Sequence, residues 1–183
     1  IGNGGVQNNI AVGFQPDLVW GKNRSSTSNH WLFDTVRDAT KMLSPDSSTV
    51  EEDQSGVTAF DSDGFTLGAW IGSTKTGDSY VAWNWKINGG TVSNVAAGDS
   101  SNIRLVAAGT ADQASVQVNT DVGISIISFE NTVRAADGFC TFPHGLGAKP
   151  DMVWLKSRTS ANYWAINHIS LGLKLGFLGT SSL

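Results

Sequence analysis

Residues 79–87 read SYVAWNWKI, and apolar side chains alternate in this run with polar or smaller ones. A period of two is the pattern of a β-strand that turns one face toward a core. It places Val81, Trp83, Trp85 and Ile87 on one face, and we expect that face to be buried.

Similar strand-like alternation recurs along much of the chain, and residues with a high β propensity dominate these segments. The segments are residues 17–22, 57–60, 65–70, 123–129 and 151–156. We therefore predict an all-β, antiparallel chain. For its core we name Val19, Phe65, Val81, Trp83 and Trp85.

Two short segments are not strands in this reading. Residues 61–64, DSDG, lie between two strand-like runs and predict a tight hairpin with Gly64 at a position that favours a positive φ. Residues 34–43 keep a helical spacing for about two turns before Ser44 and Pro45 end it. At most one short helix is expected, and an irregular loop fits this segment equally well.

An eleven-residue run occurs twice. Residues 16–26 read PDLVWGKNRSS and residues 150–160 read PDMVWLKSRTS, with seven identities at an offset of 134 residues. After a deletion of one residue, residues 29–31 align with residues 162–164. The likeness predicts an internal repeat whose second copy is truncated.

The repeat divides the chain into three predicted parts. Residues 1–88 form the first repeat, and residues 123–183 start a second repeat that is incomplete or closes against the first copy. Residues 89–122 are rich in Gly, Ser and Asn and are interpreted as a linker or an exposed hairpin around residues 114–119. We expect the sequence to begin one strand late and to end several strands early within a longer repetitive protein.

The composition excludes several classes of protein. The 183 residues contain 12 Lys and Arg against 16 Asp and Glu, a net charge of −4, and no basic block, so a dedicated nucleic-acid binder is excluded. No apolar run approaches the roughly 18 residues of a membrane span, so no membrane insertion is expected. A single cysteine, Cys140, allows no disulfide within the chain.

The repeated run also places aromatic and cationic side chains on one strand face. An indole ring can pack on a sugar while Lys and Arg donate hydrogen bonds to hydroxyl or acidic groups. In the alternative interpretation, Trp belongs to the core and the cations pair with nearby carboxylates. Both interpretations stay open for these candidate contact residues: Trp20, Lys22, Arg24, Trp31, Trp154, Lys156 and Arg158.

Signals for a metal or a catalytic group are weak. Asp61, Asp63 and the nearby Asp53 suggest calcium, but a DSDG turn forms without a metal, and no metal or cofactor is expected. The three histidines lack metal-ligand spacing, and no nucleophile elbow of the Gly-x-Ser-x-Gly kind is present. Glu51 and Glu52 are adjacent and make a poor acid and base pair for glycoside cleavage. We therefore expect that this protein is not an enzyme.

Four runs in order carry a resemblance to a known family. Residues 13–20 (GFQPDLVW), 32–37 (LFDTVR), 62–68 (SDGFTLG) and 80–86 (YVAWNWK) resemble a repeated module of bacteriophage virion proteins, especially tail, fibre-like or capsid-associated proteins of marine phages. Residues 144–154 (HGLGAKPDMVW) resemble the next tandem module. The resemblance implies an antiparallel β-sandwich of jelly-roll or concanavalin-like type, without a catalytic motif.

The resemblance implies a non-enzymatic structural module located in the virion, where it assembles with further copies of itself and with other virion proteins. The alternative is a lectin-like module that binds carbohydrate on the host surface through exposed Trp and Arg. Whether Trp20, Trp31 and Trp70 form one exposed patch distinguishes the two.

Overall fold

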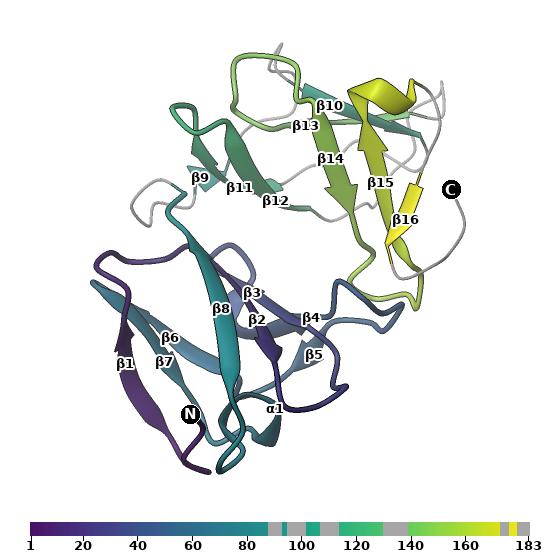
Figure 1. Cartoon of the computed structure of the whole chain (residues 1–183). Helices are drawn as coiled ribbons and strands as arrows, with labels where there is room; N and C mark the ends of the chain where they lie inside the picture. Colours follow the sequence, from purple (N-terminus) through teal and green to yellow (C-terminus); the bar gives the residue numbers. More distant parts are fainter. Residues whose placement is uncertain (88–92, 95–101, 107–113, 130–138, 173–175, 179–183) are drawn as a thin grey trace. The chain divides into compact units, whose positions relative to one another are not determined.

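The computed structural model describes residues 1–87, 93–94, 102–106, 114–129, 139–172 and 176–178. Every strand pair in this part of the chain is antiparallel, which confirms the all-β, antiparallel prediction. One short α-helix, α1 (Ile71–Thr74), and a 3-10 turn at Ile169–Leu171 are the helical segments of this part (Figure 1). No described helix has the length and apolar character needed to cross a membrane.

The chain divides into two compact units. The first, residues 1–85 with 151–183, holds three sheets. A five-stranded sheet has the order β5-β4-β3-β2-β8, with β2 (Leu18–Asn23), β3 (Trp31–Asp34), β4 (Asp38–Leu43), β5 (Glu52–Asp53) and β8 (Tyr80–Trp85). The order β1-β7-β6 joins β1 (Gln7–Ala11), β7 (Gly64–Leu67) and β6 (Val57–Asp61). The order β14-β15-β16 joins β14 (Met152–Leu155), β15 (Trp164–His168) and β16 (Gly176–Leu178).

One face of the five-stranded sheet packs on the β1-β7-β6 sheet. Val19 and Phe33 meet Val57, Phe65 and Leu67 in an apolar cluster that is almost wholly buried. Burying an apolar side chain of this size contributes about 1.5–3 kcal/mol. This cluster is the larger core of the first unit, and it confirms Val19 and Phe65 as core residues.

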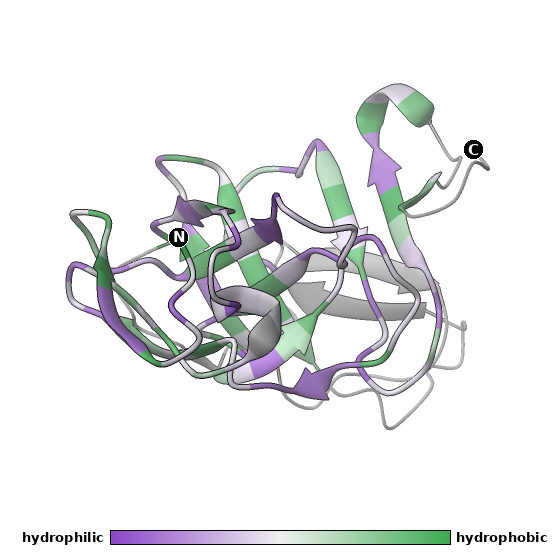
Figure 2. Ribbon diagram, turned by 60° about the horizontal axis from the view of Figure 1, so that its bottom comes forward, coloured by the Kyte–Doolittle hydropathy of each residue, from purple (hydrophilic) through white to green (hydrophobic). Residues whose placement is uncertain are grey.

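The opposite face packs on the β14-β15-β16 sheet. Leu32 and Leu43 surround Trp164, with Leu18 and Trp20 packed at the margin of this second cluster. Along β2, odd and even residues therefore serve different cores, as the alternation of a strand requires. Figure 2 shows how hydrophobic and hydrophilic residues are distributed along the ribbon.

The core face predicted for residues 79–87 is wrong in part. Trp83 is 46% exposed and Val81 and Trp85 are half-buried, whereas Ala82 packs against the larger core. Ala82 pairs with Gly21, and the ring of Trp31 lies against Gly21 so closely that a Cβ there would be 2.0 Å from it. Since Trp31 supplies the bulk of the core at this level, the small residue of β8 faces inward.

Residues 34–43 form no helix. The Asp34 carboxylate accepts hydrogen bonds from the backbone N–H groups of Val36 and Arg37, which turns the chain at once. Asp38 has a φ of 92°, and β4 then runs back along β3. A side-chain turn at Asp34 therefore overrides the helical spacing, and the short helix lies at Ile71–Thr74 instead.

The DSDG hairpin is confirmed, with Asp61 and Gly64 paired across a two-residue loop. Gly64 has no positive φ, contrary to the expectation. A Cβ on Gly64 would lie 2.1 Å from the carbonyl oxygen of Ile10 on β1. The glycine is needed here because β1 approaches β7 closely.

The second unit covers residues 86–150. β11 (Ala114–Asn119) pairs with β12 (Ile124–Phe129) in a hairpin and with β9 (Ser93–Asn94), and β10 (Asn102–Val106) pairs with β13 (Phe139–Pro143). The expected strand at residues 114–119 is present, but Val116 is buried rather than exposed. Much of the predicted linker, residues 89–92, 95–101 and 107–113, lies outside the described residues.

Candidate functional site

The two copies of the repeated run form hairpins with the same register. Trp20 pairs with Leu32 between β2 and β3, and Trp154 pairs with Ile166 between β14 and β15. The offset of 134 residues holds for both strands of the hairpin. The deletion introduced in the sequence alignment is therefore wrong, and His30 corresponds to Trp164 rather than to Tyr163.

In the neighbouring cross-strand pair, the strand that carries the large residue differs between the two hairpins. Gly21 faces Trp31 in the first, and Leu155 faces Ala165 in the second. Each hairpin thus has one bulky and one small residue at the same level. This exchange explains why Gly21 and Leu155 differ within an otherwise similar run.

Five aromatic rings, which we call the aromatic cluster, join the two hairpins. Trp20 and His30 meet edge to face with centroids 5.8 Å apart, and the corresponding Trp154 and Trp164 do so at 6.4 Å. Trp20 also contacts Trp154 at 5.9 Å and Trp83 at 6.0 Å. Each such pair contributes about 0.5–1.5 kcal/mol beyond its buried area, so the cluster fixes the second hairpin on the first.

Three indole N–H groups of the aromatic cluster donate hydrogen bonds within the cluster or to a residue beside it. Trp20 Nε1 donates to His30 Nδ1 at 2.9 Å, and Trp164 Nε1 donates to the carbonyl of Ser44 at 2.9 Å. Trp154 Nε1 lies 2.8 Å from the sulfur of Met152. These bonds orient the rings.

Lys22 and Lys156, both predicted contact residues, donate hydrogen bonds to backbone carbonyls. Each ammonium group donates to three backbone carbonyls. Two of them belong to the residues one and four positions after the lysine, and the third lies elsewhere. The acceptors are Asn23, Ser26 and Ser28 for Lys22, and Ser157, Ser160 and Ser48 for Lys156. Burial lowers the pKa of Lys156. The two lysines therefore hold the loop that follows each strand.

Arg158 belongs to a group of charges that we call the ion cluster: Asp34, Arg37, Glu51 and Arg158. Glu51 accepts two hydrogen bonds from Arg158, at 2.7 and 2.9 Å, and one from Arg37 at 3.0 Å. Arg37 also donates to Asp34 at 2.6 Å. Burial alone would raise the pKa of Glu51, but the hydrogen bonds from Arg158 and Arg37 outweigh burial and hold it below its usual value.

The remaining predicted residues are dispersed. Arg24 is exposed, whereas Trp31 is only 2% exposed in the larger core. Asp61 accepts a hydrogen bond from Thr66 at 2.7 Å, and Asp53 pairs with Lys41 at 2.8 Å. Among the described residues, no three His, Cys, Asp or Glu side chains form a group that could hold a metal ion.

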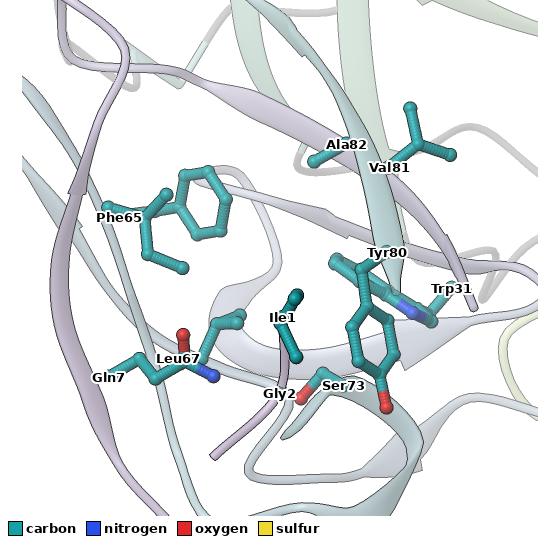
Figure 3. A pocket seen from close by; sticks show the side chains of 11 residues that line it. Ile1, Gly2, Gln7, Trp31, Phe65, Leu67, Ser73, Tyr80, Val81 and Ala82 are labelled. Atoms are coloured by element: carbon teal, nitrogen blue, oxygen red, sulfur yellow. The ribbon is translucent and has the colours of Figure 1, made fainter. Parts of the chain in front are cut away.

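A pocket of about 240 Å³ opens beside the larger core (Figure 3). Its wall is mostly apolar, and no Asp, Glu, His, Lys or Arg side chain lines it. Trp31 is one of the lining residues, and the Nε1 of Trp31 has no hydrogen-bond partner in the described part of the chain. The lining residues are Ile1, Gly2, Gln7, Ile10, Trp31, Phe65, Leu67, Ser73, Tyr80, Val81 and Ala82. The lining thus holds no carboxylate or imidazole for acid and base chemistry.

The prediction missed three features of the site. Trp83 was assigned to the core, His30 was considered only as a metal ligand, and Glu51 only as a catalytic acid. The available signal was the repeat itself, because a strict offset of 134 places His30 and Trp164 at the same point of their hairpins. The role of Glu51 has no comparable signal, since it depends on two arginines distant from it in sequence.

Comparison with known proteins gives one match. No curated protein and no solved structure matches the chain. A family model described as a domain of unknown function, DUF7483, matches residues 1–180, a range that contains both copies of the repeated run. That description names neither a phage nor a lectin, so both remain predictions. The chain belongs to the DUF7483 family.

Proposed function

We propose that this chain is a non-enzymatic assembly module of a bacteriophage virion, in its tail, fibre or capsid decoration. It acts through an apolar surface, the Trp surface, made of Trp83, Met152 and Trp154. The antiparallel sandwich of jelly-roll or concanavalin-like type belongs to the same proposal. Apolar clusters on both faces of the five-stranded sheet support a layered arrangement of that kind.

The exposure of the Trp surface carries the proposal. Trp83 is 46% exposed, Met152 49% and Trp154 39%, and both indoles contact Trp20. Trp and Met are enriched where proteins bind one another. Exposed aromatic side chains held in place by ring contacts with a half-buried neighbour lose little entropy on binding, so they suit a permanent contact between subunits.

A carbohydrate-binding platform made of the predicted contact residues has less support. Trp31 is buried, Trp20 and Trp70 are half-buried, and the ammonium groups of Lys22 and Lys156 bind backbone carbonyls. The expected patch of exposed Trp and Arg is therefore not formed by these residues. Carbohydrate binding stays the second candidate, because the exposed rings of Trp83 and Trp154 could stack on a sugar.

Sedimentation velocity over a range of protein concentrations tests the proposal. The natural chain should associate as its concentration rises, and Met152→Lys should shift it toward monomer by placing a charge on the Trp surface. Val122→Lys is the matched control, since Val122 is 59% exposed and belongs to the second unit. A chain that stays monomeric at every concentration would overturn the proposal, and glycan binding lost on Trp83→Ala would favour the second candidate.

A further inference from the structure

We propose that the outer edge of β14 is a docking site for an extended strand of another polypeptide, one that carries the residue pattern of β8 and places an indole opposite Trp154. The inference rests on the proposed function, because it names the kind of partner that the Trp surface accepts.

One row of backbone hydrogen-bonding groups of β14 pairs with no strand in the described part of the chain. The N–H of Ile169 donates to the carbonyl of Asp151 at 2.8 Å, which marks this pair as hydrogen-bonded. Such pairs alternate along an antiparallel ladder, so the N–H and C=O groups of Met152 and Trp154 point away from β15. Among the described strands, β15 alone pairs with β14.

The side chains of this edge are apolar, whereas three other edges of the same unit, those of β5, β1 and β8, are protected. β5 is two residues long and both are acidic, and β1 has an irregular register against β7. On β8 the side-chain amide of Asn84 donates to the carbonyl of Ala82 at 3.4 Å, so this carbonyl on the outer edge already has a partner. Charge, short length and irregularity are the usual means of preventing strand addition. β14 has none of them between Met152 and Leu155, so its edge is suited to receive a strand.

The first hairpin shows what fits this edge. β2 corresponds to β14, and β2 has a second neighbour in β8, where Trp83 stands opposite Trp20 with ring centroids 6.0 Å apart. An offset of 134 residues applied to this pairing places a residue like Trp83 opposite Trp154 and one like Trp85 opposite Met152. The expected partner is therefore an extended segment with aromatic residues at two alternate positions, like Trp83 and Trp85, and a small residue directly before the first of them, like Ala82.

Peptide binding tests the docking site directly. A fluorescein-labelled peptide of residues 79–86, SYVAWNWK, is titrated with the full chain, and its anisotropy should rise to saturation. Loss of the indole in a Trp83→Ala peptide should weaken binding about threefold to tenfold, the affinity equivalent of one aromatic pair. Met152→Lys in the protein should weaken binding as well, because a charge on an edge disfavours strand addition. Val122→Lys should bind like the natural chain.

Disulfide trapping tests the register. In a Cys140→Ser background, Met152→Cys is incubated in a glutathione buffer with a peptide carrying Trp85→Cys or, as the matched control, Val81→Cys. Opposite residues have the Cα separation that a disulfide needs, and residues four positions out of register do not. Mass spectrometry should find about tenfold more mixed disulfide with the first peptide, which corresponds to a difference of about 1.4 kcal/mol.

Two results would overturn the inference: no rise in anisotropy up to about 1 mM of protein, or equal capture of both cysteine peptides. Failure of the inference is distinguishable from failure of the proposed function. Self-association without peptide binding rejects the docking site alone. Peptide binding by a chain that stays monomeric keeps the docking site and rejects self-assembly.

Discussion

The rings of Trp20 and Trp154 meet edge to face with centroids 5.9 Å apart, although the two residues lie 134 positions apart in the sequence. They occupy the same place in the two copies of the repeated run. The contact therefore joins like to like, and each indole is also in contact with the aromatic residue of its own hairpin, His30 or Trp164. The free energy of unfolding of the first unit should therefore depend strongly on the contact between Trp20 and Trp154.

Trp20→Ala should lower the free energy of unfolding by about 3 kcal/mol, since it removes a half-buried ring, three ring contacts and the hydrogen bond to His30. Urea denaturation measures the change. Trp83→Ala is the control: it removes an exposed ring from the same cluster and should cost clearly less. Equal losses in the two variants would contradict a central role for Trp20.

Glu51→Gln should destabilise the chain by about 3 kcal/mol, because Arg37 stays buried without its full set of negative partners. The side chain of Arg37 is 6% exposed, so water cannot replace the lost carboxylate. Asp53→Asn breaks the exposed pair with Lys41 and should leave the unfolding midpoint unchanged. If both variants unfold like the natural chain, the ion cluster contributes nothing measurable.

The pKa of Glu51 also predicts how stability depends on pH. In the folded chain this pKa lies below its usual value of 4.5, so the ionised carboxylate stabilises the fold at pH values above 4.5. This contribution is lost as the pH falls from 4.5 through the lower folded-state pKa. Thermal melts in this acid range should show a steeper loss of stability for the natural chain than for Glu51→Gln. Parallel curves would contradict the prediction.

Gly21→Leu should be strongly destabilising on its own, because the new side chain overlaps the ring of Trp31. Combined with Trp31→Ala, it reproduces the pair formed by Leu155 and Ala165. The double variant should be more stable than the sum of the two single losses by about 1–3 kcal/mol. A double-mutant cycle by urea denaturation measures this coupling, and purely additive losses would show that the two sites are independent.

The sequence predicts strands better than it predicts their faces. Alternation located β2, β7 and β14, and the DSDG run located the hairpin at Asp61, because both signals are local. The orientation of β8 could not be derived from its own residues, since apolar clusters cover both faces of the five-stranded sheet. The small Ala82 faces the larger core because the ring of Trp31, from another strand, fills the space there.

The candidate site shows the same limit. The seven predicted contact residues were selected for sugar-binding chemistry, but both lysines among them bind carbonyls of loops whose path no local pattern specifies. Arg158 likewise binds Glu51, which is 107 residues away in the sequence. The repeat pointed to the correct strands, and the partners of their side chains depended on long-range packing.

The exchange of large and small residues between the pairs Gly21–Trp31 and Leu155–Ala165 restricts genetic recombination. A crossover within a hairpin would join the strand of Leu155 to the strand of Trp31, which places two bulky side chains face to face, or would join Gly21 to Ala165, which leaves a hole. The two strands of each hairpin therefore have to be kept together, and a strand of one hairpin cannot replace the corresponding strand of the other.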